Sequence, residues 1–165
     1  MKILVVSDTH GWDIGLNAAI KKETPFDMLI HLGDLEGSEL KLQYTVSCPL
    51  VMVCGNNDFN TALSMTTTVR VPGHKIFVTH GHKYHVKMGR GPMCADAARD
   101  ECDIVLYGHT HRELIEWEGN ILVINPGSLT YPRNENHTPS YAVLTIDKDL
   151  QVDVELRYLS DEELG

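Results

Sequence analysis

A chain of 165 residues with 42% hydrophobic and 22% charged residues is long enough to bury the core of one globular domain, which we expect to span residues 1–165. Its net charge of −9 would repel a phosphate backbone, which argues against a general nucleic-acid-binding protein. The N-terminal apolar stretch is too short for a signal peptide, and no later stretch approaches the roughly 18 apolar residues of a membrane span. These totals predict a cytoplasmic protein that does not bind membranes.

Apolar runs typical of strands recur along the whole chain, and helical spacing of apolar residues appears between the early runs. The expected helices are 13–22, 38–44 with Ser38 as its N-cap, and 92–101, and the acidic residues 160–165 are expected to form a frayed end. The expected strands are 2–6, 28–32, 50–54, 67–71, 74–79, 103–107, 113–117, 120–124, 140–146 and 151–158. Alternating strands and helices followed by hairpins predict an α/β protein with two stacked sheets and helices outside.

A polar cluster follows each of five apolar runs, usually beside a glycine. The clusters are residues 7–11, 33–34, 55–58, 80–82 and 108–111. Open α/β sheets bind ligands at the carboxyl ends of their strands, so these loops should converge if the strands are parallel neighbours. The glycines would permit tight turns and let the backbone pass close to a ligand.

The best-placed side chains in these clusters are two carboxylates, one amide and four imidazoles: Asp8, His10, Asp34, Asn56, His80, His109 and His111. Such a mixed oxygen and nitrogen set suits Mn²⁺, Fe or Zn²⁺ better than Mg²⁺ or Ca²⁺, which prefer oxygen alone. The set is too large for one tetrahedral ion, but it suits two ions if one carboxylate bridges them. We therefore expect two divalent ions per chain, with Mn²⁺ as the first choice and Zn²⁺, Fe or Ni²⁺ as alternatives.

In their order and spacing, these motifs resemble those of the calcineurin-like metallophosphoesterase superfamily, and in particular its small YfcE-type phosphodiesterases. The motifs are DTH at 8–10, GD at 33–34, GNND at 55–58, HGH at 80–82 and GHTH at 108–111, and NPGS at 125–128 also matches the small subfamily. The resemblance covers nearly the whole chain. It implies the metallophosphoesterase fold, a four-layer α/β/β/α sandwich of two mixed β-sheets flanked by helices.

The resemblance also implies how the ligands divide between the two ions. One ion would be held by Asp8, His10, Asp34 and His111, and the other by Asp34, Asn56, His80 and His109, so that Asp34 bridges. A hydroxide between the ions would attack phosphorus in line, so the expected activity is hydrolysis of a phosphodiester bond. The expected partners are a small phosphodiester substrate and further copies of the chain, in a homodimer or homotetramer.

Two further residues are candidates for a catalytic role in handling the leaving group. Larger enzymes of the superfamily carry a histidine directly after the ligand asparagine, whereas this chain has Asn57, whose amide cannot act as a general acid. His82 is the alternative proton donor, although it could instead orient His80 or cap a turn. We expect aryl phosphodiesters, which have good leaving groups, to turn over faster than alkyl ones.

Two other functions are compatible with such a fold. An interaction scaffold, like the small subunit of retromer, would tend to have lost ligands from the set, whereas a phosphomonoesterase would need more positive charge around the terminal phosphate. Lys83, Lys87 and Arg90 could draw in an anionic substrate or form a solvated loop face. Asp58 could hold a neighbouring loop in place or lie exposed in a turn.

The remaining polar candidates have structural interpretations. His31 is expected to pack within its strand, and the four cysteines are expected to be free, mostly buried thiols. His74, His85 and His137 are assigned no role. Trp12 could wall the site or pack in the core.

Overall fold

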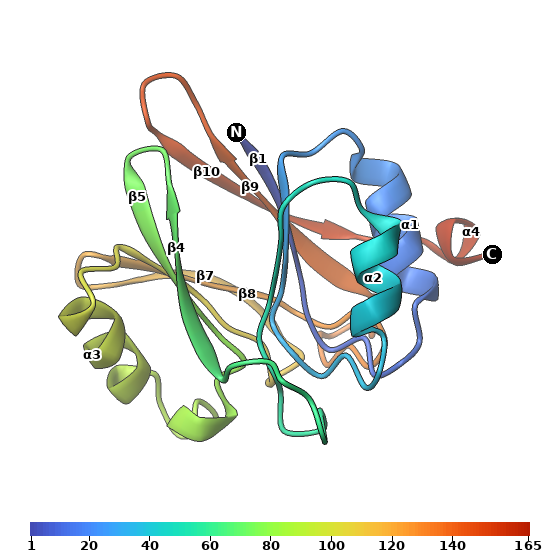
Figure 1. The fold of residues 1–165 in the computed structure, drawn as a ribbon, viewed down its shortest axis with the longest axis horizontal. Coiled ribbons are helices and arrows are strands. Elements are labelled where there is room, and N and C mark those ends of the chain that lie inside the picture. The colour runs from blue at the N-terminus through green and yellow to red at the C-terminus, as the bar shows by residue number, and fades with distance from the viewer.

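The chain folds into four layers, in which two β-sheets stack face to face and helices cover both outer faces (Figure 1). The computed structural model describes residues 1–165. Helices α1 (Ile14–Glu23) and α2 (Glu39–Thr45) pack on one sheet, and helix α3 (Gly91–Arg99) packs on the other. This arrangement confirms the α/β/β/α sandwich that the sequence predicts.

The first sheet contains three neighbouring parallel strands. Its order is β10–β9–β1–β2–β3, and β1 (Lys2–Val6), β2 (Met28–His31) and β3 (Leu50–Met52) run parallel. Strands β9 (Ser140–Ile146) and β10 (Val152–Tyr158) form an antiparallel hairpin beside β1. The parallel register brings residues 7–11, 33–34 and 55–58 to the same edge of this sheet.

The second sheet has the same plan, with parallel strands at its centre. Its order is β4–β5–β6–β8–β7, and β5 (His74–Thr79), β6 (Ile104–Leu106) and β8 (Ile121–Pro126) run parallel. The antiparallel strands β4 (Thr66–Val71) and β7 (Glu113–Glu118) form its edges. Residues 80–82 and 108–111 therefore follow the carboxyl ends of β5 and β6, and NPGS lies at the end of β8.

Alternate side chains of each central strand enter different cores. In β1, Ile3 lies in the core between the sheets, whereas Leu4 packs in the core beneath α1. In β6, Ile104 lies between the sheets and Val105 packs beneath α3. A strand covered on both faces reads as a continuous apolar run, which is why these strands could be recognised without an alternating pattern.

The acidic tail does not fray, contrary to the sequence prediction. Residues Asp161–Leu164 form the short helix α4, and Glu163 accepts a hydrogen bond at 2.8 Å from the backbone of Ser160 at the start of that helix. Glu163 also pairs with Lys22 of α1 at 2.8 Å. The tail is thus held against α1 by charge, which an acidic composition alone does not reveal.

Ser38 occupies the N-cap position of α2 as predicted, but its hydroxyl does not cap the helix. It donates to Asp13 Oδ1 at 2.8 Å and so joins the starts of α1 and α2. The chain also makes a short 3₁₀ helix at His82–Tyr84, which the sequence pattern did not predict. None of the helices has the length and apolar content needed to cross a membrane.

The histidine and cysteine interpretations are mostly confirmed. His31 is buried in β2, where its Nε2 lies 3.1 Å from the Thr9 hydroxyl, and all four cysteines are free thiols, three of them buried. His74 is an exception, because its two ring nitrogens contact Asp103 at 2.5 Å and the Leu150 carbonyl at 2.8 Å. Burial lowers the pKa of His74, but these two contacts outweigh burial and raise it. His74 therefore fastens β5 to neighbouring loops.

Candidate metal centre

The five polar loops meet at one end of the sandwich and bring the predicted ligands together. Four side chains place one ligand atom each within 4.8 Å of all the others: Asp8, His10, Asp34 and His111. The remaining three gather beside them. His80 Nε2 lies 3.2 Å from Asn56 Oδ1 and 3.5 Å from Asp34 Oδ2, and the His80 and His109 ring centroids are 5.1 Å apart. The two groups share Asp34.

Hydrogen bonds fix the tautomer of three of these histidines. In each, Nδ1 lies within hydrogen-bond distance of an oxygen that can only accept, so Nδ1 carries a proton and Nε2 is the ring nitrogen directed at the carboxylates. The acceptors are Glu36 Oε1 for His10 at 2.7 Å, the Leu32 carbonyl for His80 at 2.8 Å, and the Tyr131 carbonyl for His111 at 2.7 Å. All three Nε2 atoms lie within 4.0 Å of an oxygen of Asp8 or Asp34, as ligands to a shared cation would.

The two carboxylates are buried without a neutralising side chain of fixed charge. Asp8 is fully buried and Asp34 is 1% exposed. Asp8 Oδ1 accepts no hydrogen bond, although His111 Nε2 lies only 3.0 Å away. Burial raises the pKa of Asp8, but His111, His80 and Ser7 outweigh it and lower the pKa to about 2. A buried carboxylate oxygen without a hydrogen-bond partner is costly, and a cation bound beside it would offset that cost, so these residues fit a bound metal ion.

His109 is also suited to bind a metal ion, because its burial favours the neutral imidazole. Burial lowers its pKa to about 4, and the neighbouring His80 and Lys87 act in the same direction. The ring is therefore held in the neutral form that binds metals. Its backbone N–H donates to Asp8 Oδ2 at 3.1 Å, which also fixes the loop that carries His109 and His111.

Five of the predicted ligands have left-handed backbone conformations. Their φ angles are +56° for Asp8, +48° for His10, +56° for Asp34, +67° for His109 and +59° for His111. Residues other than glycine rarely adopt this region, and each such residue costs on the order of 1–3 kcal/mol. Strain of this kind is concentrated at functional sites, because a ligand or a catalytic geometry requires it.

Asp58 holds the two loops that carry Asp34 and Asn56. Its Oδ2 accepts backbone hydrogen bonds from Asp34 and Gly55, both at 2.7 Å, and its Oδ1 accepts one from Glu36 at 2.7 Å. Of the two interpretations that the sequence left open, the structure therefore supports an outer-sphere carboxylate over an exposed turn residue. Asp58 holds Asp34 in place through backbone hydrogen bonds and forms no hydrogen bond with a ligand side chain.

Replacing Asp58 with alanine is expected to weaken metal binding by about 10–100-fold, because outer-sphere partners of metal ligands typically contribute that much. The orphaned N–H groups should also lower the free energy of unfolding by about 1–3 kcal/mol. Asp147→Ala is the matched control, since Asp147 also accepts two backbone bonds, in the β9–β10 turn. Calorimetric titration with Mn²⁺ would show the account wrong if both variants bound the metal equally well.

The two residues proposed to act on the leaving group lie at the site but differ in their contacts. Asn57 donates to both oxygens of Asp34, from its backbone N–H at 2.9 Å and from Nδ2 at 2.8 Å. His82 packs against His80, with ring centroids 5.4 Å apart, and its buried Nδ1 has no hydrogen-bond partner. Burial lowers the pKa of His82. Asn57 is thus placed to orient the shared carboxylate, and a catalytic role for either residue stays a prediction.

Several supporting residues were missed by sequence reasoning. Ser7 donates to Asp8 Oδ2 at 2.5 Å and Ser128 donates to the Asp8 carbonyl at 2.9 Å. Asn125 donates to the Gly108 carbonyl at 2.9 Å, and Glu36 accepts from His10. Each lies next to a motif or, for Asn125 and Ser128, within NPGS, so adjacency to the motifs was the available signal.

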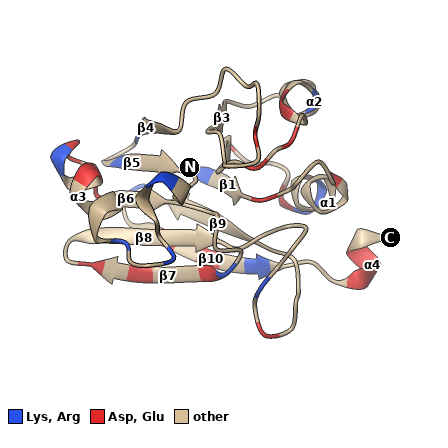
Figure 2. Ribbon diagram, turned by 90° about the horizontal axis from the view of Figure 1, so that it is seen from below, with Lys and Arg blue, Asp and Glu red and all other residues tan.

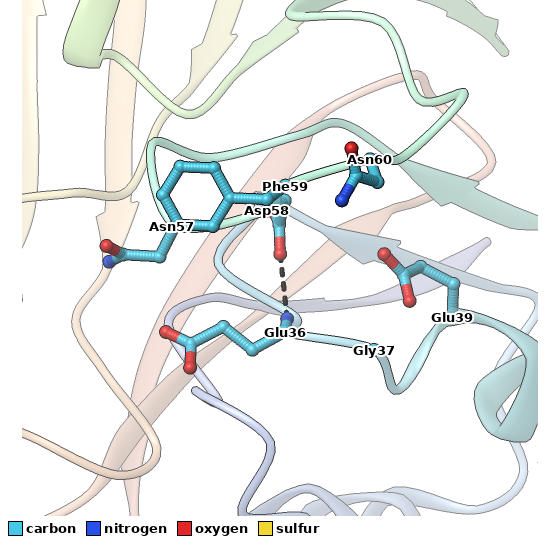
Figure 3. A pocket seen from close by; sticks show the side chains of 7 residues that line it. All are labelled: Glu36, Gly37, Glu39, Asn57, Asp58, Phe59 and Asn60. Carbon is cyan, nitrogen blue, oxygen red and sulfur yellow. Dashed lines mark hydrogen bonds between the residues drawn. The ribbon is translucent and has the colours of Figure 1, made fainter.

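A pocket of about 540 Å³ with an acidic lining adjoins the centre. Figure 3 shows its lining, which includes the carboxylates of Glu36, Glu39 and Asp58 and the ring of Phe59. Phe59 is 80% exposed. Trp12 is also largely exposed, at 62%, so it does not pack in the core. Asn57 also lines this pocket, so the pocket opens directly beside the shared carboxylate of Asp34.

The sandwich and the ligands at its strand ends define a phosphoesterase of the calcineurin-like type. The model of the calcineurin-like phosphoesterase superfamily domain matches residues 1–149, and the chain belongs to this family. This confirms the family that the motifs indicated.

Named relatives agree with this assignment. "Probable metallophosphoesterase YsnB" of Bacillus subtilis is 35% identical over 150 residues, which cover 90% of this chain and 86% of that protein. "Phosphodiesterase MJ0936" of Methanocaldococcus jannaschii is 28% identical over 144 residues, covering 77% and 83% of the two chains. Vps29 of Entamoeba histolytica, solved in complex with zinc, has the same fold, with a TM-score of 0.75, 23% identity, and 96% and 99% of the two chains covered.

Proposed function

We propose that this chain is a phosphodiesterase that works with two divalent metal ions, preferentially Mn²⁺, and hydrolyses a small phosphodiester. The observation that carries the proposal is the pair of buried carboxylates, Asp8 and Asp34, which face the Nε2 atoms of His80 and His111 and form no salt bridge with a lysine or arginine. Asp34 belongs to both ligand groups, so it is the residue that would bridge.

In this proposal the chain's own residues prepare the site. Glu36, Leu32 and Tyr131 set the tautomers of the histidines, and Asn57 and Asp58 hold Asp34. Two bound divalent ions supply a water of lowered pKa and neutralise charge on the phosphoryl oxygens. His82 is the candidate for protonating the leaving oxygen, since its Nδ1 has no other partner. The amide of Asn57 cannot donate a proton to a leaving alkoxide.

The main alternative is a non-catalytic interaction scaffold with the same fold. Vps29 shares this architecture at 23% identity, and at that level the likeness establishes the fold alone. The intact ligand set supports an enzyme, because a scaffold has no need of strained, buried ligands. A phosphomonoesterase is less well supported, since the pocket that opens beside Asp34 is acidic and would repel a dianionic monoester.

Turnover of matched esters with a panel of divalent cations tests the proposal. We expect Mn²⁺-dependent hydrolysis of bis-p-nitrophenyl phosphate, weaker hydrolysis of p-nitrophenyl phosphate, and alkyl diesters slower than aryl diesters by roughly 10²-fold or more, because a general acid typically contributes that much. Failure of every ester with every metal would favour the scaffold. Equal rates on aryl and alkyl diesters would instead show that the leaving oxygen is protonated efficiently despite Asn57.

A further inference from the structure

A second pocket, of about 480 Å³, is lined in part by Thr110 of the 108–111 loop and has a lining of the opposite charge. Its lining includes four cationic side chains and one carboxylate: Lys87, Arg90, Arg112, Arg133 and Glu113. The acidic pocket of Figure 3 has three carboxylates and no cation among its lining residues. The two pockets therefore present electrostatic potentials of opposite sign, and each would favour a different substituent of a bound phosphodiester.

Three of the four cations are free to bind an anion. Arg90 is neutralised by Glu116 at 2.5 Å and Glu118 at 2.8 Å, on the acidic strand β7 (Figure 2). Lys87, Arg112 and Arg133 are exposed and form no salt bridge. Glu113 Oε1 accepts from the Tyr158 hydroxyl of β10 at 3.2 Å, and Glu113 Oε2 has no hydrogen-bond partner. Of the three cations that the sequence offered for attracting substrate, only Lys87 lines this pocket without a salt bridge, because Arg90 is neutralised and Lys83 lies outside the lining, over the ring of Tyr84.

The free cations are tied directly to the loop that carries two metal ligands. Thr110 lines the pocket and lies between His109 and His111 in the chain. Arg112 follows His111, and the backbone N–H of Arg133 donates to the His111 carbonyl at 2.8 Å. An anion bound by these side chains would therefore adjoin a phosphoryl group held at the metal centre.

We propose that Lys87, Arg112 and Arg133 form a subsite for a second phosphate, so that the preferred substrate is a phosphodiester that also carries a phosphate monoester. This inference rests on the proposed function and assigns its substrate class. Arginine forks bind phosphate oxygens in pairs, and a dianion gains more from three cations than a singly charged group does. The acidic pocket repels the same phosphate, so the substrate binds in one orientation, with its uncharged substituent toward Phe59.

A matched pair of chromogenic substrates tests the subsite. One is the p-nitrophenyl ester of thymidine monophosphate, and the other carries a second phosphate on the remaining sugar hydroxyl. We expect kcat/KM to favour the second ester by about tenfold at low salt and less at high salt, as for exposed charge contacts. The triple variant Lys87→Met, Arg112→Gln, Arg133→Gln should bring the ratio close to one. Arg70→Gln, an exposed cation on β4 at the far end of the sheet, should keep the wild-type ratio.

Calorimetry provides a readout that does not require turnover. Thymidine bisphosphate should bind the Mn²⁺-loaded protein about tenfold more tightly than thymidine monophosphate, and the triple variant should lose this preference. Hydrolysis of both esters with a wild-type ratio near one would overturn the subsite and leave the proposed function standing. Hydrolysis of neither ester would overturn the proposed function, while the preference for the bisphosphate would still test the subsite.

Discussion

Replacing Asp34 with asparagine is expected to abolish metal-dependent hydrolysis and to empty both metal positions together. Asp34 is 1% exposed, belongs to the group with Asp8, His10 and His111, and lies 3.5 Å from His80 Nε2 in the second group. Loss of a ligand shared by two ions should reduce kcat/KM by more than the roughly 10–100-fold typical of outer-sphere changes. Asn56→Ala, in contrast, should chiefly weaken the ion near His80.

Measuring the metal content of each variant distinguishes the loss of one or both ions from general damage to the fold. Asp153→Asn removes a carboxylate of the same kind from the exposed face of β10 and should leave both metal content and activity at the wild-type level. Elemental analysis after dialysis should find little Mn²⁺ in Asp34→Asn and about half the wild-type content in Asn56→Ala. Full metal content in the Asp34 variant would contradict its bridging position.

Gly55→Ala is expected to have the second largest effect on stability and metal binding. The cause is a steric clash and not the loss of a charge. A Cβ at position 55 would collide with Asp34 Oδ1 and would lie 2.5 Å from the Asp34 backbone nitrogen. Neither the shared carboxylate nor its backbone can move without breaking the hydrogen bonds from Asn57 and to Asp58. We expect a loss of about 1–3 kcal/mol in the free energy of unfolding, as for overpacked sites, together with loss of Mn²⁺ binding.

The control for this substitution is Gly91→Ala at the start of α3. A Cβ there meets no atom within 4 Å, and alanine favours the helix. Thermal unfolding and Mn²⁺ titration of the two variants should therefore diverge, with Gly91→Ala unchanged or slightly more stable. Wild-type metal affinity in Gly55→Ala would mean that Asp34 is not held where the structure places it.

The residues of the centre were predictable because parallel strands deliver their loops to one edge. The apolar runs before Asp8, Asp34 and His80 are covered on both faces, so they could be recognised as strands. Motif order then identified the family, since five short motifs in sequence are far more specific than any one of them.

The backbone carbonyls that fix the ligand histidines were not predictable, because they belong to segments distant in the chain. The carbonyl that fixes His111 belongs to Tyr131, and the carbonyl that fixes His80 belongs to Leu32. A backbone carbonyl has no sequence signature, so only the fold reveals such a partner. The pairing of the tail with Lys22 and the neutralisation of Arg90 by β7 were hidden for the same reason.

Anomalous diffraction from a crystal grown with Mn²⁺ tests the central claim most directly. We expect two peaks, roughly 3.5–4 Å apart, that share the carboxylate of Asp34. One peak should contact Asp8, His10 and His111, and the other should contact Asn56, His80 and His109. A single peak, or none in contact with Asp34, would contradict a two-metal centre and the hydrolysis proposed from it.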